Sequence, residues 1–116
     1  MALLVALFAF LNTTAAAQEM QQVQAIVNGV RSPQHAAQAD AILRGQPGVI
    51  ISRTDFNTRN LLLHTTGQAG LGATQLNDLL APLGMSVRCY QRSPLGSAPF
   101  QHLDPRTCGT PPEPSR

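Results

Sequence analysis

Charged residues are scarce in this chain. Acidic and basic residues together make up 12% of its 116 residues, the formal net charge is +2, and all eight basic residues are arginines. A surface for nucleic acid or for an anionic membrane needs clustered positive charge, whereas these few charges are scattered. The composition therefore argues against both partners. It also argues against an enzyme, because a pocket of perturbed acids and bases is hard to build from so few charges.

Aromatic residues are also scarce. They make up 4% of the chain, and tryptophan is absent. Proteins that bind single-stranded nucleic acid stack bases on exposed aromatic rings, so no such platform is expected here. The length fits one domain.

The N-terminus begins with an apolar run from Met1 to Leu11 (MALLVALFAFL). This run is shorter than the about 20 residues that a membrane-spanning helix needs. Small residues follow at Ala15 and Ala17, which suits a signal peptidase. We therefore predict a signal peptide over 1–17, cleavage before Gln18, and a periplasmic or secreted mature protein that does not insert into a membrane. A buried N-terminal helix or a short anchor is the alternative, because no basic residue precedes the run.

The two cysteines are Cys89 and Cys108. In an exported chain an even pair of cysteines favours a disulfide. Closing a loop of this size would contribute on the order of 3 kcal/mol. The alternatives are two free thiols, or a Cys89 side chain buried in a strand.

The apolar patterns predict four strands and two helices. β-Branched residues and partial alternation predict strands over residues 22–30, 49–55, 61–65 and 85–91. Ser32 before Pro33 predicts the cap and first turn of a helix that ends at Arg44, before a Gly-Gln-Pro-Gly stop. A second helix is expected where leucines recur at helical spacing, with Thr74 as its cap and Gly84 as its stop.

This order, β-α-β-β-α-β, predicts an α+β fold. We expect a ferredoxin-like sandwich, in which two helices cover one face of a four-stranded antiparallel sheet. The domain should span residues 18–92. Residues 93–116 are rich in proline and serine, and they predict a partly disordered C-terminal tail that ends in PPEPSR.

The spacing resembles the heavy-metal-associated (HMA, metallochaperone-like) domain family. That family's pattern is Gly-Met-x-Cys-x-x-Cys, a helix, and a Pro-Gly-Val-like turn into the second strand. Here residues Gly29–His35 occupy the motif, Pro47–Val49 form the turn, and Leu79–Met85 resemble the second helix and its exit. The resemblance covers about residues 23–88 and implies metal binding or transfer.

The family's two cysteines are replaced here by Ser32 and His35. A hydroxyl is a poor ligand for the soft ions that two thiolates hold. The resemblance places Met85 in the exit loop beside the motif. His35 and Met85 are therefore the candidate ligands for Cu(I) or another soft metal ion, with an exported or membrane protein as the partner in transfer.

The alternative gives these residues structural roles. Ser32 then caps the helix, His35 is an exposed residue of the first turn, and Met85 fills the core in place of an aromatic residue. In that case the chain is a protein-interaction module that has lost the family's metal site.

No catalytic constellation is evident in the sequence. Ser32, His35 and Asp40 share one helix start and lack a nucleophile elbow or an oxyanion motif. His64 and His102 have no partner at ligand spacing, which favours surface roles for both. We therefore expect a protein that is not an enzyme.

Overall fold

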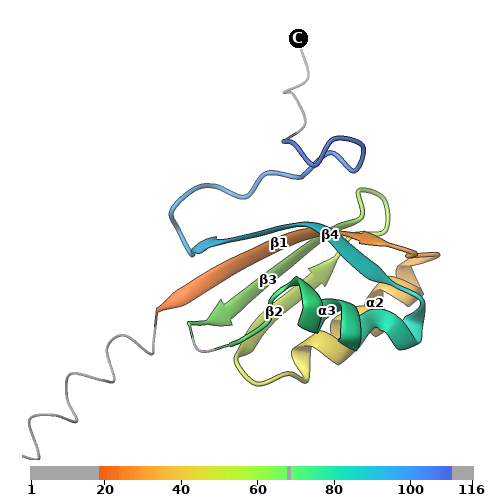
Figure 1. Cartoon of the computed structure of the whole chain (residues 1–116), viewed down its shortest axis with the longest axis horizontal. Coiled ribbons are helices and arrows are strands. Elements are labelled where there is room, and N and C mark those ends of the chain that lie inside the picture. The colour runs from red at the N-terminus through yellow and green to blue at the C-terminus, as the bar shows by residue number, and fades with distance from the viewer. Residues whose placement is uncertain (1–18, 68, 111–116) are drawn as a thin grey trace, which may run out of the picture.

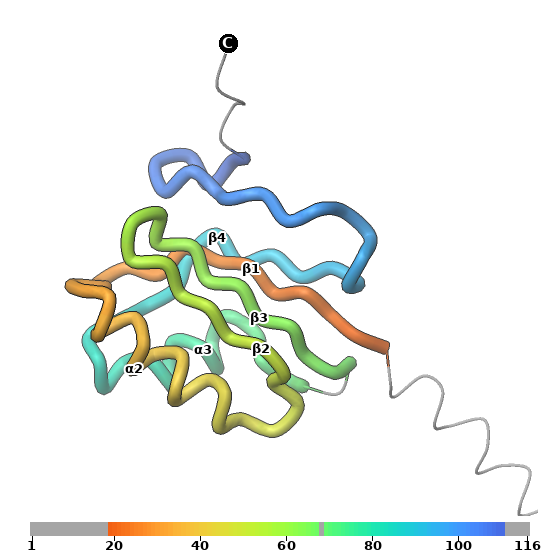
Figure 2. Tube along the Cα trace, turned by 180° about the vertical axis from the view of Figure 1, so that it is seen from behind, coloured from red at the N-terminus to blue at the C-terminus, as the bar shows by residue number. Residues whose placement is uncertain are grey.

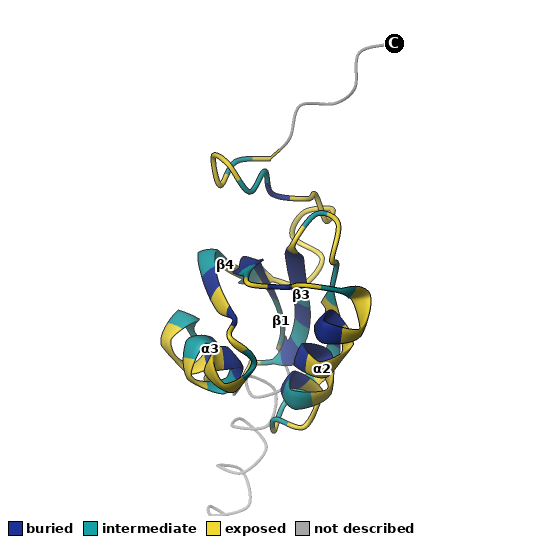
Figure 3. Ribbon diagram, turned by 90° about the vertical axis from the view of Figure 1, so that its right-hand side faces the viewer, coloured by how far each residue is buried: buried dark blue, intermediate teal, exposed yellow. Residues whose placement is uncertain are grey.

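The computed structural model describes residues 19–67 and 69–110. The predicted signal peptide and the final PPEPSR lie outside the described residues. The elements are β1 (Met20–Asn28), α2 (Pro33–Arg44), β2 (Val49–Thr54), β3 (Asn60–Thr66), α3 (Ala73–Leu80), the 3₁₀ turn η1 (Ala81–Leu83) and β4 (Ser86–Pro94). The four strands form one antiparallel sheet in the order β2-β3-β1-β4 (Figure 1). Both helices cover the same face (Figure 3), which confirms the predicted ferredoxin-like fold.

The hydrophobic core lies between the sheet and the helices. Alternate residues of a strand point to the same face, and residues three or four apart share one face of a helix. The two patterns meet in a cluster that is almost fully buried, whose main members are Val23, Ala25, Val27, Ala36, Ala39, Leu43, Leu61, Leu63, Leu76, Leu80 and Met85. Among the described residues, no helix is both long and apolar enough to cross a membrane.

Helix α2 begins and ends where the sequence predicts. The Ser32 hydroxyl accepts a hydrogen bond from the His35 N–H at 3.0 Å, and Pro33 occupies the first turn. Ala36 and Ala39 are buried, and their small side chains let α2 lie close to the sheet.

The start of α3 differs from the prediction, because Thr74 is not its cap. The capping position is held by Gly72, and the Gln75 side chain accepts the Gly72 N–H at 3.1 Å. The regular helix ends at Leu80, and Pro82 lies in the 3₁₀ turn that follows. A proline has no N–H to continue the helical ladder, which accounts for the early change.

Two strands have bounds that differ from the prediction by two residues or more. β1 ends at Asn28 instead of residue 30, since Gly29 has a φ of +89° and turns the chain out of the sheet. β4 runs to Pro94, three residues beyond the prediction, because it pairs with the whole length of β1 as far as Gln21.

A β-bulge interrupts the pairing of β1 with β4. Gln24 pairs with Gln91, and Ile26 pairs with Arg88. Cys89 and Tyr90 of β4 therefore lie opposite the single residue Ala25 of β1. Cys89 has a φ of 59°, in the left-handed region that such bulges use. The extra residue changes the phase of the strand and turns Cys89 away from the helix-covered face.

The tail after β4 forms a third layer. Residues 95–110 run along the face of the sheet opposite the helices (Figures 2 and 3). The Asn60 side chain accepts the Leu103 N–H at 2.7 Å and donates to the Leu103 carbonyl at 3.0 Å. Leu103 is 3% exposed. The predicted Cys89–Cys108 disulfide is present, with its Cα atoms 5.4 Å apart.

Candidate functional site

The motif loop, residues 29–35, connects β1 to α2. The exit loop is residues 83–85, the end of η1 and the two residues after it. Gly29, the first residue of the motif loop, lies so close to it that a Cβ there would overlap the Gly84 carbonyl oxygen. The motif loop and the exit loop are therefore neighbours, as the family resemblance predicted.

The imidazole of His35 joins the two loops. Its Nδ1 atom accepts the Arg31 backbone N–H at 3.1 Å, and its Nε2 atom lies 2.9 Å from the Leu83 carbonyl oxygen. Because Nδ1 accepts, the hydrogen-bond network assigns the ring proton to Nε2, which donates to Leu83. The ring is 6% exposed. The expectation that His35 would be an exposed first-turn residue is therefore wrong, because its bond to Leu83 draws the ring under the exit loop.

The surroundings of His35 do not suit a cation. The Ser32 hydroxyl already accepts the His35 N–H, and the Arg31 guanidinium lies 3.5 Å from His35 Nε2. A fixed positive charge at that distance disfavours a second cation beside the same nitrogen. As placed, a metal ion would have to replace the bond from His35 to Leu83.

Met85 belongs to the hydrophobic core. It is 3% exposed and lies in the buried cluster between the sheet and the helices. The residues that the structure describes contain no group of three or more His, Cys, Asp or Glu side chains placed to hold a metal ion. His64 lies on β3, and His102 lies in the tail with its ring edge-to-face against Phe100 at 5.0 Å.

Several solved structures with this arrangement are described as copper proteins. One is a putative copper-ion-binding protein from Bacillus anthracis str. Ames, with a TM-score of 0.54 and 11% identity over 61% of this chain and 99% of that protein. Another is the N-terminal domain of a potential copper-translocating P-type ATPase from Bacillus subtilis, with a TM-score of 0.53 and 13% identity over 60% of this chain and 85% of that domain. A copper form of CopA from Bacillus subtilis has a TM-score of 0.52 and 20% identity, over 61% of this chain and 92% of that chain.

The fold is that of a heavy-metal-associated domain. At 11–20% identity these likenesses show the HMA fold alone. No protein family model and no curated protein matches the sequence.

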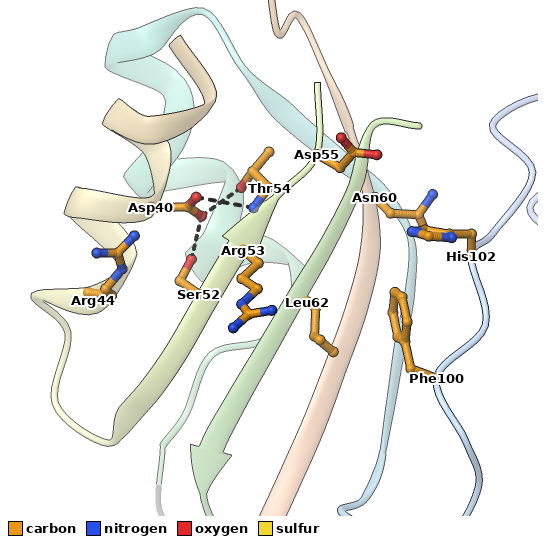
Figure 4. Close-up of a pocket in the computed structure, with 10 residues that line it drawn as sticks. All are labelled: Asp40, Arg44, Ser52, Arg53, Thr54, Asp55, Asn60, Leu62, Phe100 and His102. Atoms are coloured by element: carbon orange, nitrogen blue, oxygen red, sulfur yellow. Dashed lines mark hydrogen bonds between the residues drawn. The ribbon is translucent and has the colours of Figure 1, made fainter. Parts of the chain in front are cut away.

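A cavity of about 480 Å³ lies along β2, an edge strand of this HMA fold (Figure 4). Its lining comes from α2, β2 with the turn after it, β3 and the tail. The residues are Asp40, Arg44, Ser52, Arg53, Thr54, Asp55, Asn60, Leu62, Phe100 and His102. The sequence gives no sign of this cavity, because one of its walls is formed by Phe100 and His102 of the tail, which are far along the chain from the other lining residues.

The acidic groups of the cavity are engaged within the protein. The Asp40 carboxylate accepts hydrogen bonds from the Ser52 hydroxyl at 2.7 Å and from the Thr54 hydroxyl at 2.9 Å (Figure 4). The Thr58 hydroxyl donates to Asp55 at 2.6 Å, and this bond is the main reason why the pKa of the Asp55 carboxyl lies below its ordinary value.

The two arginines of the cavity have no such partner among the residues that the structure describes. Arg44 and Arg53 are exposed, and neither forms an ion pair with any residue that the structure describes. The cavity therefore combines two available guanidinium groups with the apolar surfaces of Leu62 and Phe100.

Proposed function

We propose that this protein is an exported HMA-fold domain that has lost the family's metal chemistry and acts by binding another protein. The observation that carries the proposal is the state of His35, whose two ring nitrogens are both hydrogen-bonded to the backbone of the neighbouring loops. Where the family has a metal-binding pair of thiolates, this chain has a bond between two loops. The bond holds the two loops together without a metal ion.

The binding surface in this proposal is the edge of β2 with the cavity beside it. An edge strand offers free backbone N–H and C=O groups to an extended segment of a partner. Ile50 on this strand is 53% exposed, and Arg44 and Arg53 offer positive charge. The complementary partner is an extended protein segment that carries acidic and apolar side chains.

Soft-metal binding is the second candidate function. In its favour, the similar structures are described as copper proteins, and His35 lies against the exit loop just before Met85. It would require His35 to exchange its bond to Leu83 for a metal ion, and Met85 to present its thioether outside the core. An imidazole and a thioether suit Cu(I).

A competitive Cu(I) titration separates the two functions. Mature protein from Gln18, with its disulfide intact, is titrated against a colorimetric chelator, alongside the His35→Ala and Met85→Leu variants. We expect no competition by any of the three proteins. Tight one-to-one binding that is lost in both variants would overturn the proposal and establish a metal carrier with a rebuilt site.

The partner class is tested with a displayed library of random linear peptides, selected on the immobilised mature domain. We expect acidic residues to be enriched, and we expect Arg53→Glu to weaken the selected peptides at least tenfold, because it replaces attraction by repulsion. Arg59→Glu is the matched control, since Arg59 is also exposed but does not line the cavity. Equal losses in both variants, or selection without acidic enrichment, would contradict the proposed surface.

Export is tested separately from binding. The full-length chain, expressed in a bacterium with a periplasm, should appear there or in the medium with Gln18 as its first residue. Intact mass and N-terminal sequencing of the fractions check this. A full-length chain retained with the cells and beginning at Met1 would contradict export.

A further inference from the structure

The disulfide has one exposed end and one sheltered end. Cys108 is exposed to solvent, whereas Cys89 is half-buried in the β4 bulge. Cys108 sits in a tight turn, because its N–H donates to the Asp104 carbonyl at 2.8 Å. This exposed residue is therefore held in an ordered turn.

A guanidinium group lies against both sulfur atoms. Arg88 Nη1 is 3.6 Å from Cys89 Sγ and 3.7 Å from Cys108 Sγ. The same side chain is fixed from two sides, since Nε donates to the Asn28 side chain at 3.0 Å and Nη2 donates to the Pro105 carbonyl. Among the described residues Arg88 has no ion-pair partner.

A neutral disulfide gains little from such a cation, but a thiolate gains a great deal. Positive charge beside a cysteine favours its ionised form, and a stabilised thiolate is a better leaving group in thiol–disulfide exchange. The contact of Arg88 with the sulfurs therefore has its chemical effect only when the disulfide opens.

We propose that Cys89–Cys108 is a thiol–disulfide exchange site for thiol and dithiol reductants. The incoming thiolate attacks the exposed Cys108 sulfur and forms a mixed disulfide there, while the Cys89–Cys108 bond breaks and Cys89 leaves as a thiolate beside Arg88. A second thiolate then attacks the sulfur of the first, which releases Cys108 as a thiolate. The protein disulfide gains two electrons, two thiols are oxidised to one disulfide, and the protein thiolates take up protons from water according to pH.

The tail makes this exchange reversible. Leu103 is held by Asn60 independently of the disulfide, through bonds of 2.7 and 3.0 Å. Opening the disulfide thus frees the turn around Cys108 without releasing the tail from the sheet. The two thiols stay close and can form the disulfide again when an oxidant is present.

The test uses oxidised mature protein and reduced glutathione. The rate of reduction is followed by thiol labelling and intact mass, and peptide mapping after an acid quench locates the glutathione. We expect the mixed disulfide on Cys108 and a reduction rate about threefold to tenfold lower in Arg88→Gln, because the leaving thiolate loses its neighbouring charge. Arg88→Lys should restore part of the rate. Arg92→Gln on the same strand is the control, since that side chain bonds to the Ala69 carbonyl on the other face.

A second measurement keeps the test valid if Arg88→Gln disturbs the fold. In the Cys108→Ser variant, the pH dependence of alkylation by iodoacetamide reports the Cys89 thiol. We expect its midpoint below the ordinary value of about 8.5, and higher when Arg88→Gln is added. Glutathione on Cys89, unchanged rates in Arg88→Gln, or a Cys89 midpoint at or above the ordinary value would each overturn the proposal.

Discussion

Gly29 is the residue at which the two loops of the candidate site come into contact. It has a φ of +89°, and a Cβ at this position would overlap the backbone oxygen of Gly84. We predict that Gly29→Ala lowers the free energy of unfolding by about 2–4 kcal/mol, because the backbone strain and the overlap act together. Urea denaturation followed by circular dichroism measures the loss.

Gly84→Ala is the matched control for this prediction. Gly84 also has a positive φ, of 73°, but a Cβ there meets nothing within 4 Å. Its cost should be only the backbone term, about 1–2 kcal/mol. Equal losses in the two variants would mean that the close approach of the loops contributes nothing.

A second residue-scale prediction concerns Thr65 on β3. It is fully buried, and its hydroxyl oxygen has no hydrogen-bond partner among the described residues. An unpaired buried hydroxyl costs free energy, so Thr65→Val should leave stability unchanged or raise it by about 1 kcal/mol. The midpoint of thermal unfolding checks this. A loss of more than about 1 kcal/mol would show that the hydroxyl has a partner after all.

At the residue scale, the sequence predicts interactions that are local and misses those that are not. The Ser32 cap was predictable because donor and acceptor lie three residues apart. The burial of His35 was not, since the Leu83 carbonyl that binds it is 48 residues away. The cap of α3 was misplaced because Thr74 is a good capping residue by type, whereas the helix begins after Gly72, whose N–H is accepted by the Gln75 side chain.

At the scale of elements, hydrogen bonds to the Asp40 side chain connect α2 to β2. Its carboxylate accepts hydrogen bonds from both Ser52 and Thr54, and it is 8% exposed. Asp40→Ala should destabilise the domain by about 2–4 kcal/mol, because it also leaves the buried Ser52 hydroxyl unpaired. Chemical denaturation measures this, with Asp78→Ala as control, an exposed aspartate on α3 that should change stability by less than about 0.5 kcal/mol.

The elements themselves were largely predictable, and their irregularities were not. The α2 bounds agreed with the sequence because Ser-Pro and Gly-Gln-Pro-Gly mark the two ends. The bulge at Cys89 has no such signal: it requires a positive φ at a residue that is not glycine. A strand predicted by alternation alone would place Cys89 on the helix-covered face, where Cys108 could not reach it.

At the scale of the whole molecule, the Asn60 side chain binds the tail to the sheet. Its side chain bonds to Gln24, to the Thr58 carbonyl and twice to Leu103, and it is 3% exposed. With Asn60→Ala we expect hydrogen exchange at the Leu103 amide to quicken at least tenfold and stability to fall by about 2 kcal/mol. The disulfide stays intact, so the loss isolates the Asn60 contribution.

Asn57→Ala, in the exposed turn before β3, is the control. Unchanged exchange at Leu103 in Asn60→Ala would mean that the disulfide alone holds the tail. The sequence predicted a partly disordered tail from its composition. Composition takes no account of Asn60, whose side chain offers one donor and one acceptor to the backbone of Leu103.

The central place of β1 has a consequence for how the chain folds. β1 pairs with both β3 and β4, so one of its sides is completed only by the last strand of the sheet. Such non-local pairing raises the entropic barrier to folding, because large loops must close before either ladder of β1 can form. A nascent chain that stops before residue 86 would leave one side of β1 without its neighbour. The complete four-stranded sheet should therefore form only when nearly all of the chain has been synthesised.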